Sequence, residues 1–211
     1  MINRVTLAKS SAVVLAFLSG LSGPAAGALR DTLWHVVDGL CVGNQRLTAS
    51  PAPCSVVDSD RGFAILWAGG AHYLLVPTAK IPGIESDALL APAAPNYWAL
   101  AWQSRTFLSD TVGKVVPRSV IAMAINSAQA RTQDQLHIHI GCLRRDVLAA
   151  LRRFEAKFPA GRSTHSVILA GRKYTVMRIQ GDGLDQADPF KLVAETSAAA
   201  VSSPWLRRDR R

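Results

Sequence analysis

Residues 126–141 read NSAQARTQDQLHIHIG, and this stretch decides the fold of the 211-residue chain. Its second half alternates polar and apolar residues. On a β-strand, such alternation places Gln135, His137 and His139 on one face and the leucine and isoleucines between them on the other. The pattern predicts a strand over residues 135–142 that buries its apolar face and displays two histidines.

A short polar loop precedes this strand and follows an apolar run at residues 119–125. Two apolar runs separated by a polar segment are typical of antiparallel strands joined by a loop. The loop side chains Asn126, Thr132 and Gln133 could donate hydrogen bonds to an anion. We therefore expect the loop to fold over the histidine face.

The rest of the chain mixes strands and helices without a repeating strand-helix-strand order. Hairpins are expected at 62–76 and 165–179, and helices at 31–39, 96–109, 144–158 and from 189 to about 200. The aromatic residues of the helix at 96–109 recur at helical spacing, which favours core packing over an acyl-chain surface. This order predicts one α+β domain with an antiparallel sheet.

Residues 1–28 have the layout of a secretory signal. Arg4 and Lys9 precede an apolar stretch, and Ala26-Gly27-Ala28 matches the small-residue pattern of a cleavage site. An uncleaved anchor is the alternative. A spanning helix needs about 20 predominantly apolar residues, whereas glycines and a proline interrupt this stretch, so cleavage and export are favoured.

The cysteine pattern agrees with export. Cys41 and Cys54 flank a loop rich in serine, proline, alanine and asparagine that cannot pack on itself, so a disulfide between them is predicted. Cys142 ends the histidine strand and is expected to be a small buried apolar residue rather than a nucleophile.

The chain is basic, with 24 lysines and arginines against 15 acidic residues and a net charge of +9. Without Arg4 and Lys9 the counts are 22 and 15, which leaves +7. This excess suits an anionic membrane surface, although four arginines lie in the tail at 201–211, which is expected to be disordered. No nucleic-acid module is recognised, so no nucleic acid is expected as a partner, and the oligomeric state stays open.

The strand resembles the signature of the histidine-triad (HIT-like) superfamily, in which three histidines alternate with apolar residues. Here the triad reads QLHIHI at 135–140, with Gln135 at the first position. Over roughly residues 29–195 the chain is similar to the CDP-diacylglycerol pyrophosphatase branch of that superfamily. The matching segments, besides Cys41 and Cys54, are YLLVPT at 73–78, GIES at 83–86, PN at 95–96, LAWQ at 100–103, AINS at 124–127, RTQ at 131–133 and DPF at 188–190.

The resemblance implies a HIT-like antiparallel sheet with flanking helices at 29–200. It implies hydrolysis of CDP-diacylglycerol to CMP and phosphatidate at the periplasmic face of a bacterial inner membrane. It implies that His137 attacks the cytidine-side phosphorus and forms a nucleotidyl-histidine intermediate. His139 would donate a hydrogen bond to phosphate oxygens, and Gln135 could keep a neutral donor where histidine is usual.

The substrate-binding candidates lie outside the strand. The resemblance and the loop position make Asn126, Thr132 and Gln133 candidate contacts of phosphate or sugar. Lys80 follows the 72–76 strand, where a basic residue could meet a phosphate, although a solvated lysine is the simpler interpretation.

Two other interpretations stay open. No metal or other cofactor is expected, because a histidine nucleophile needs none, but His137 and His139 with one of His35, His72 or His165 could form a zinc-type site. A catalytically impaired nucleotide- or lipid-binding protein of the same fold is the second alternative, suggested by Gln135 and by the short segment after residue 195.

Overall fold

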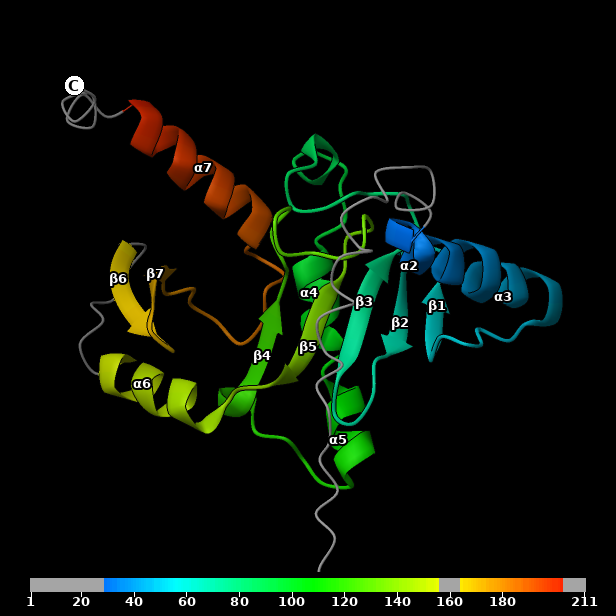
Figure 1. Cartoon of the computed structure of the whole chain (residues 1–211), viewed down its shortest axis with the longest axis horizontal. Coiled ribbons are helices and arrows are strands. Elements are labelled where there is room, and N and C mark those ends of the chain that lie inside the picture. Colours follow the sequence, from blue (N-terminus) through cyan, green and yellow to red (C-terminus); the bar gives the residue numbers. More distant parts are fainter. Residues whose placement is uncertain (1–28, 156–163, 203–211) are drawn as a thin grey trace, which may run out of the picture.

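The computed structural model describes residues 29–155 and 164–202. At its centre lies a five-stranded antiparallel sheet with the strand order β1-β2-β3-β5-β4 (Figure 1). Its strands are β1 (Val56–Asp58), β2 (Phe63–Trp67), β3 (Tyr73–Pro77), β4 (Ile121–Ala124) and β5 (Ile138–Cys142). This architecture confirms the predicted α+β class with an antiparallel sheet.

One face of the sheet carries the larger core. Ile138 and Ile140 of β5 are fully buried, together with Ile65, Leu75 and Leu108. The helices α4 (Tyr97–Gln103) and α5 (Thr106–Val112) supply aromatic and aliphatic side chains to this cluster, and a 3-10 turn (Asp87–Leu89) adds Leu89. The predicted alternation of β5 is therefore confirmed on its apolar side.

The other face is covered over β1, β2 and β3 by an N-terminal helix in three consecutive parts (Figure 1): α2 (Thr32–Trp34), a π-helical segment (His35–Val42) and α3 (Gly43–Thr48). Val37 of this helix is fully buried against Ala64 and Val76. The predicted disulfide between Cys41 and Cys54 is present, and both cysteines lie in this second cluster. It ties the π-helical segment to the segment that enters β1.

Several details differ from the sequence interpretation. The helix expected at 31–39 continues as α3 into the segment between Cys41 and Cys54 that was expected to be a loop, and β1 was not expected. The helix expected at 96–109 is interrupted at Ser104 and Arg105, although Asn96 caps its first part as predicted by accepting from the backbone N–H of Ala99 at 3.0 Å. The ladder of β5 starts at Ile138, three residues later than expected. Cys142 is exposed and not buried, and it is the last residue of β5.

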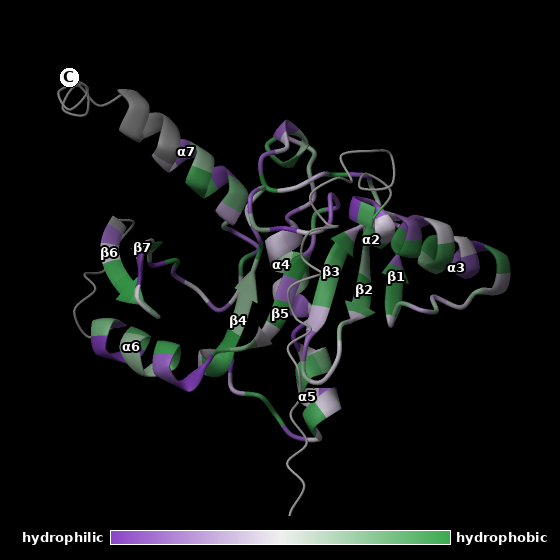
Figure 2. Ribbon diagram, viewed as in Figure 1, coloured by the Kyte–Doolittle hydropathy of each residue, from purple (hydrophilic) through white to green (hydrophobic). Residues whose placement is uncertain are grey.

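The C-terminal part carries a separate two-stranded sheet of β6 (Thr164–Leu169) and β7 (Arg172–Met177) between α6 (Arg145–Glu155) and α7 (Pro189–Ser202) (Figure 1). The α6 helix is amphipathic, with hydrophilic and hydrophobic residues on different sides (Figure 2). Among the described residues, no helix is long and apolar enough to span a bilayer. The proposed signal at 1–28 and most of the basic tail lie outside these residues.

Candidate active site

His137 and His139 lie on the sheet face that carries the N-terminal helix, beside the strands that this helix covers. The apolar cluster under this helix contains residues of β1, β2 and β3 and none of β4 or β5. His139 lies directly opposite Leu74 of β3 and Ala124 of β4, so it belongs to that face. The strand order thus displays the histidines beside the helix.

His137 makes a hydrogen bond that fixes which ring nitrogen carries the proton. Its Nδ1 lies 2.7 Å from the backbone carbonyl oxygen of Gln135. A carbonyl oxygen only accepts, so Nδ1 must donate, and in the neutral ring the lone pair is then on Nε2. The residue is only 8% exposed, so this orientation is held by its surroundings.

His139 is bonded at both ring nitrogens. Its Nδ1 lies 2.9 Å from Nε2 of His72, and its Nε2 lies 3.5 Å from the side-chain amide nitrogen of Asn126. Burial, together with the neighbouring His137 and His72, lowers the pKa of His139 to about 4. The ring is therefore neutral near pH 7 and carries a single proton.

Gln135 occupies a different place from the one its position in the triad suggests. Its side chain is fully buried and donates to the backbone carbonyls of Pro77 and Ala79 at 3.0 and 2.9 Å, while its oxygen accepts from the N–H of Ile81 at 3.2 Å. The amide nitrogen thus donates to two backbone carbonyls, and the amide oxygen accepts from one backbone N–H. Gln135 thus positions the segment after β3 against the start of β5 and presents only its main-chain carbonyl to His137.

The loop between β4 and β5 is held by ion pairs. The guanidinium of Arg131 contacts the carboxylates of Glu85 and Asp134 at 2.7 and 2.9 Å, and Asp134 also accepts from Arg30 at 2.7 Å. The two arginines hold the pKa of Asp134 well below its usual range. Gly83 packs so closely against Arg131 that a Cβ atom there would lie 2.4 Å from its guanidinium.

Of the four predicted binding residues, the structure brings only Asn126 next to a site histidine. Gln133 uses its amide on the N-terminal segment, accepting from the N–H of Leu33 and donating to the carbonyl of Leu29. Lys80 pairs with Asp31 at 3.2 Å. Thr132 is exposed on the loop. Gln133 and Lys80 thus link the loops around the site to the N-terminal helix.

Sequence reasoning did not place His72 beside His139, since it named His72 only as one of three alternative third ligands of a zinc-type site. His72 directly precedes β3 on the same face as Leu74, and this alternation was the signal that could have found it. Within the described residues, no group of three or more histidine, cysteine, aspartate or glutamate side chains has the spacing to hold a metal ion.

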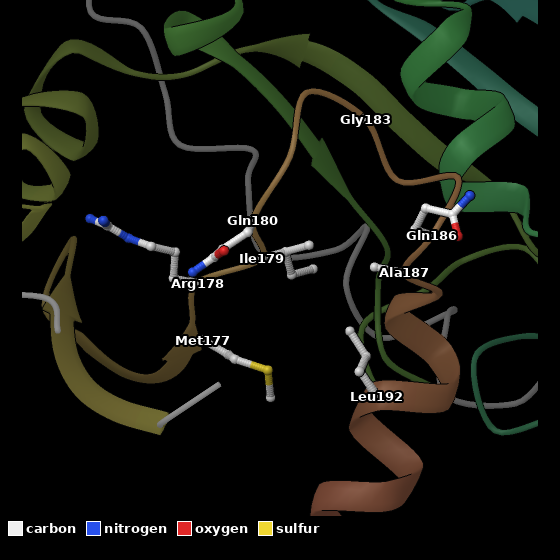
Figure 3. Close-up of a pocket in the computed structure, with 8 residues that line it drawn as sticks. All are labelled: Met177, Arg178, Ile179, Gln180, Gly183, Gln186, Ala187 and Leu192. Carbon is white, nitrogen blue, oxygen red and sulfur yellow. The ribbon is translucent and has the colours of Figure 1, made fainter. Parts of the chain in front are cut away.

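A separate cavity of about 410 Å³ lies in the C-terminal part (Figure 3). Its lining comes from the segment that leaves β7 and from the start of α7, with Met177 and Leu192 approaching it from these two elements. None of the site histidines lines it.

Comparison with known proteins places the chain in a family. Residues 28–204 match the family model described as CDP-diacylglycerol pyrophosphatase. The chain belongs to the CDP-diacylglycerol pyrophosphatase family. A CDP-diacylglycerol pyrophosphatase of Yersinia pestis is 41% identical over 172 residues, which cover 81% of this chain and 67% of that protein.

Members of the CDP-diacylglycerol pyrophosphatase family are hydrolases of a phosphoric anhydride, and this chain is accordingly a hydrolase. The match spans the sheet, the N-terminal helix and the loop with Asn126, so the family assignment covers every residue of the candidate site.

Proposed function

We propose that this protein cleaves the diphosphate linkage of CDP-diacylglycerol with His137 as the nucleophile, giving CMP and phosphatidate. The observation that supports the proposal is the hydrogen bond from Nδ1 of His137 to the carbonyl of Gln135. Because it holds the proton on Nδ1, it leaves a nucleophilic lone pair on Nε2. The family match supplies the substrate class.

The first step forms a bond between Nε2 of His137 and the cytidine-side phosphorus and breaks the bridging P–O bond. The electron pair of that bond leaves with phosphatidate. Phosphatidate is a phosphate monoester whose departing oxygen is a weak base, so no strong general acid is required. The ring becomes positively charged in the intermediate, and the carbonyl of Gln135 stabilises it through Nδ1–H.

The second step adds water to phosphorus and breaks the N–P bond, which releases CMP and restores His137. His139 lies beside the nucleophile, with ring centroids 5.0 Å apart, and is placed to donate a hydrogen bond to the phosphate oxygens. Asn126, which contacts His139, is the loop residue best placed to bind the same oxygens. Neither step requires a metal ion.

The site of action that we propose is the periplasmic face of the inner membrane, with residues 1–28 as the export signal or anchor. The support is the signal-like sequence and the disulfide between Cys41 and Cys54, a bond that persists in oxidising compartments. An impaired binding protein is the competing function. The observation behind it is Gln135 at the first triad position, where the structure shows a buried positioning residue.

The test is release of CMP from CDP-diacylglycerol in detergent micelles by the purified protein, with EDTA present. His137→Ala is compared with His35→Ala, which removes an exposed histidine of the N-terminal helix. Wild type and His35→Ala are expected to release CMP, and His137→Ala to be slower by at least about 1000-fold.

The other outcomes separate the alternatives. Full activity of His137→Ala would refute the assignment of the nucleophile. Loss of wild-type activity in EDTA with recovery on adding zinc would favour a metal site, and binding of the lipid without turnover would favour the impaired binder. Radiolabel from the nucleotide that is trapped on His137 would support the covalent step directly.

A further inference from the structure

The hairpin between β2 and β3 ends in an exposed apolar tip. Residues 62–79 read GFAILWAGGAHYLLVPTA and contain no lysine, arginine, aspartate or glutamate, although the whole chain carries a net charge of +9. Residues 67–70 at the turn are exposed, and Trp67 is 56% exposed. Tryptophan is enriched where a protein meets another protein or a membrane, so this side chain marks a candidate contact surface.

Hydrogen bonds within the hairpin hold the tip in one shape. Gly69 and Gly70 take the positive φ angles that the turn needs, and the backbone N–H of Ala68 donates to the carbonyl of His72 at 2.9 Å. The indole N–H of Trp67 donates to the carbonyl of Gly70 at 2.8 Å. The polar group of this side chain is therefore satisfied, and the indole can enter an apolar environment without leaving a donor unpaired.

The end of α5 extends the apolar surface. Trp67 pairs with Tyr73 across the hairpin, so both side chains lie on the same face, and the hydroxyl of Tyr73 lies 2.7 Å from that of Thr111 in α5. Val112, the last residue of α5, is 39% exposed, and Val115 in the loop that follows is 84% exposed. The hairpin and the end of α5 lie at the same end of the sheet (Figure 1). We call residues 67–70 with these two valines the tip surface.

The border of the tip surface is basic. Lys114, after α5, and Arg145, at the start of α6, are exposed, and neither pairs with a carboxylate within the part of the chain that the structure describes. Arg144 is paired with Asp146, and Asp110 is an exposed carboxylate of α5. Two unpaired basic side chains thus stand against one carboxylate, a charge balance that complements an anionic lipid surface.

The tip surface also lies at a suitable distance from the histidines. His139 is opposite Leu74 of β3, which is four residues from Gly70, or about 13 Å at about 3.3 Å per residue. An apolar segment that lies in a membrane interface enters it by about 5–10 Å, which would leave His139 about 3–8 Å outside the acyl chains. The headgroup layer is about 5–8 Å thick, so the histidine face would lie at headgroup level.

We propose that the tip surface docks this protein on the anionic bilayer that holds its substrate, with Trp67 inserted between the headgroups and the acyl chains. Docking brings the histidines to the diphosphate while the diacylglycerol part of the substrate stays in the membrane. The inference rests on the proposed function, because that function assigns a lipid substrate to the histidines.

Binding is tested without substrate, by sedimentation with vesicles of phosphatidylcholine and phosphatidylglycerol. Trp67→Ala is expected to bind about 10-fold more weakly, because burying a large apolar side chain contributes about a factor of 10 or more. Trp67→Phe is expected to keep most of the binding. Leu47→Ala, which truncates an 85% exposed side chain of α3, is the control and is expected to match wild type. Wild-type binding by Trp67→Ala would overturn the proposal.

Fluorescence quenching tests which tryptophan enters the bilayer. Acyl chains that carry bromine quench a tryptophan that touches them. Wild-type fluorescence is expected to fall on binding to such vesicles, and Trp67→Phe is expected to bind with little quenching. Equal quenching of both proteins would show that another tryptophan enters the bilayer, which would overturn the proposal.

Turnover separates docking from damage to the site. Trp67→Ala is expected to cleave long-chain CDP-diacylglycerol in vesicles about 10-fold more slowly, in line with its weaker binding, and a dissolved short-chain analogue at the wild-type rate. Equal losses on both substrates would overturn the docking role. Wild type that cleaves neither substrate would instead defeat the proposed function, and the sedimentation result would still decide whether the tip surface binds lipid.

A second copy of this chain is the other possible occupant of the tip surface. Analytical ultracentrifugation of wild type and Trp67→Ala distinguishes it. A dimer that Trp67→Ala abolishes, together with no vesicle binding by wild type, would overturn the proposal.

Discussion

At the scale of single residues, the three site histidines differ because each makes a different hydrogen bond. His137 donates to a backbone carbonyl and keeps the lone pair on Nε2. His139 has side-chain partners at both nitrogens and a lowered pKa. Nε2 of His72 lies within hydrogen-bond distance of Nδ1 of His139. These differences are set by the hydrogen-bond partner of each ring nitrogen and not by the residue type alone.

Gln135 gives a prediction about stability. Gln135→Ala leaves the carbonyls of Pro77 and Ala79 and the N–H of Ile81 without their partner in a buried place. We expect the free energy of unfolding to fall by about 2–4 kcal/mol, since each buried group that loses its partner costs about 1–3 kcal/mol and water can satisfy some of them. Urea unfolding followed by circular dichroism measures the change.

The matched control is Gln186→Ala, which truncates an exposed glutamine and should leave stability within about 0.5 kcal/mol of wild type. Gln135→His is expected to destabilise as well, because a neutral imidazole has one donor and cannot serve both carbonyls. A Gln135→Ala protein as stable as the control would show that these three bonds contribute nothing net.

At the scale of elements, the loop between β4 and β5 is positioned by charge. Arg131 has a side chain only 9% exposed and joins the loop to Glu85 and to Asp134, which Arg30 also contacts. The loop begins with Asn126, one of the partners of His139. The ion pairs therefore position the loop that carries Asn126, which we propose as a substrate-binding residue.

Asp134→Asn tests this network. Hydrogen bonds to charged groups contribute about 1.5–3 kcal/mol when partly buried, and Asn keeps part of them, so we expect a loss of about 1–2 kcal/mol near neutral pH. The folded-state pKa of Asp134 is lowered by its arginines, so its contribution is complete above the unfolded pKa of about 3.9 and disappears as the pH falls further.

The stability difference between wild type and Asp134→Asn should therefore narrow on acidification. Urea unfolding at about pH 7 and about pH 3 measures it, with the exposed Asp60→Asn as the charge-matched control. A difference that widens at low pH would contradict the assigned direction of the pKa shift.

At the scale of the whole molecule, the net charge predicts how the protein meets its lipid substrate. The chain carries +9, and exposed Arg152 and Arg153 add positive charge to α6. Each basic residue near an anionic bilayer contributes about 1 kcal/mol of attraction. We expect co-sedimentation with vesicles that contain anionic lipid at low salt, weaker binding at high salt, and little binding to neutral vesicles.

Replacing Arg152 and Arg153 by glutamine should weaken this sedimentation if α6 faces the membrane, while CMP release from neutral detergent micelles stays unchanged. Equal binding to neutral and anionic vesicles, or binding insensitive to salt, would show that charge does not bring the protein to the surface.

Much of the fold followed from local patterns. The alternation of β5, the glycine turn at 69–70 and the Asn96 cap are decided by a few neighbouring residues, so β2, β3, β4, β5 and the start of α4 were predictable. The strand β1 was not predicted. The helix breaks at Ser104 and Arg105, and Cys142 is exposed at the end of β5; no local sequence pattern predicted either feature.

The sequence by itself determined the antiparallel α+β class, the Cys41–Cys54 bond and the pair of histidines on one strand, since period, composition and spacing are properties of the chain. Only the tertiary structure decided that His72 meets His139, that the side chain of Gln135 is buried, and that Gln133 serves the N-terminal helix. These contacts join residues 54 to 100 positions apart, and the pairing of distant strands sets them. No local pattern specifies such pairs, because the hydrogen-bond partner is supplied by another element.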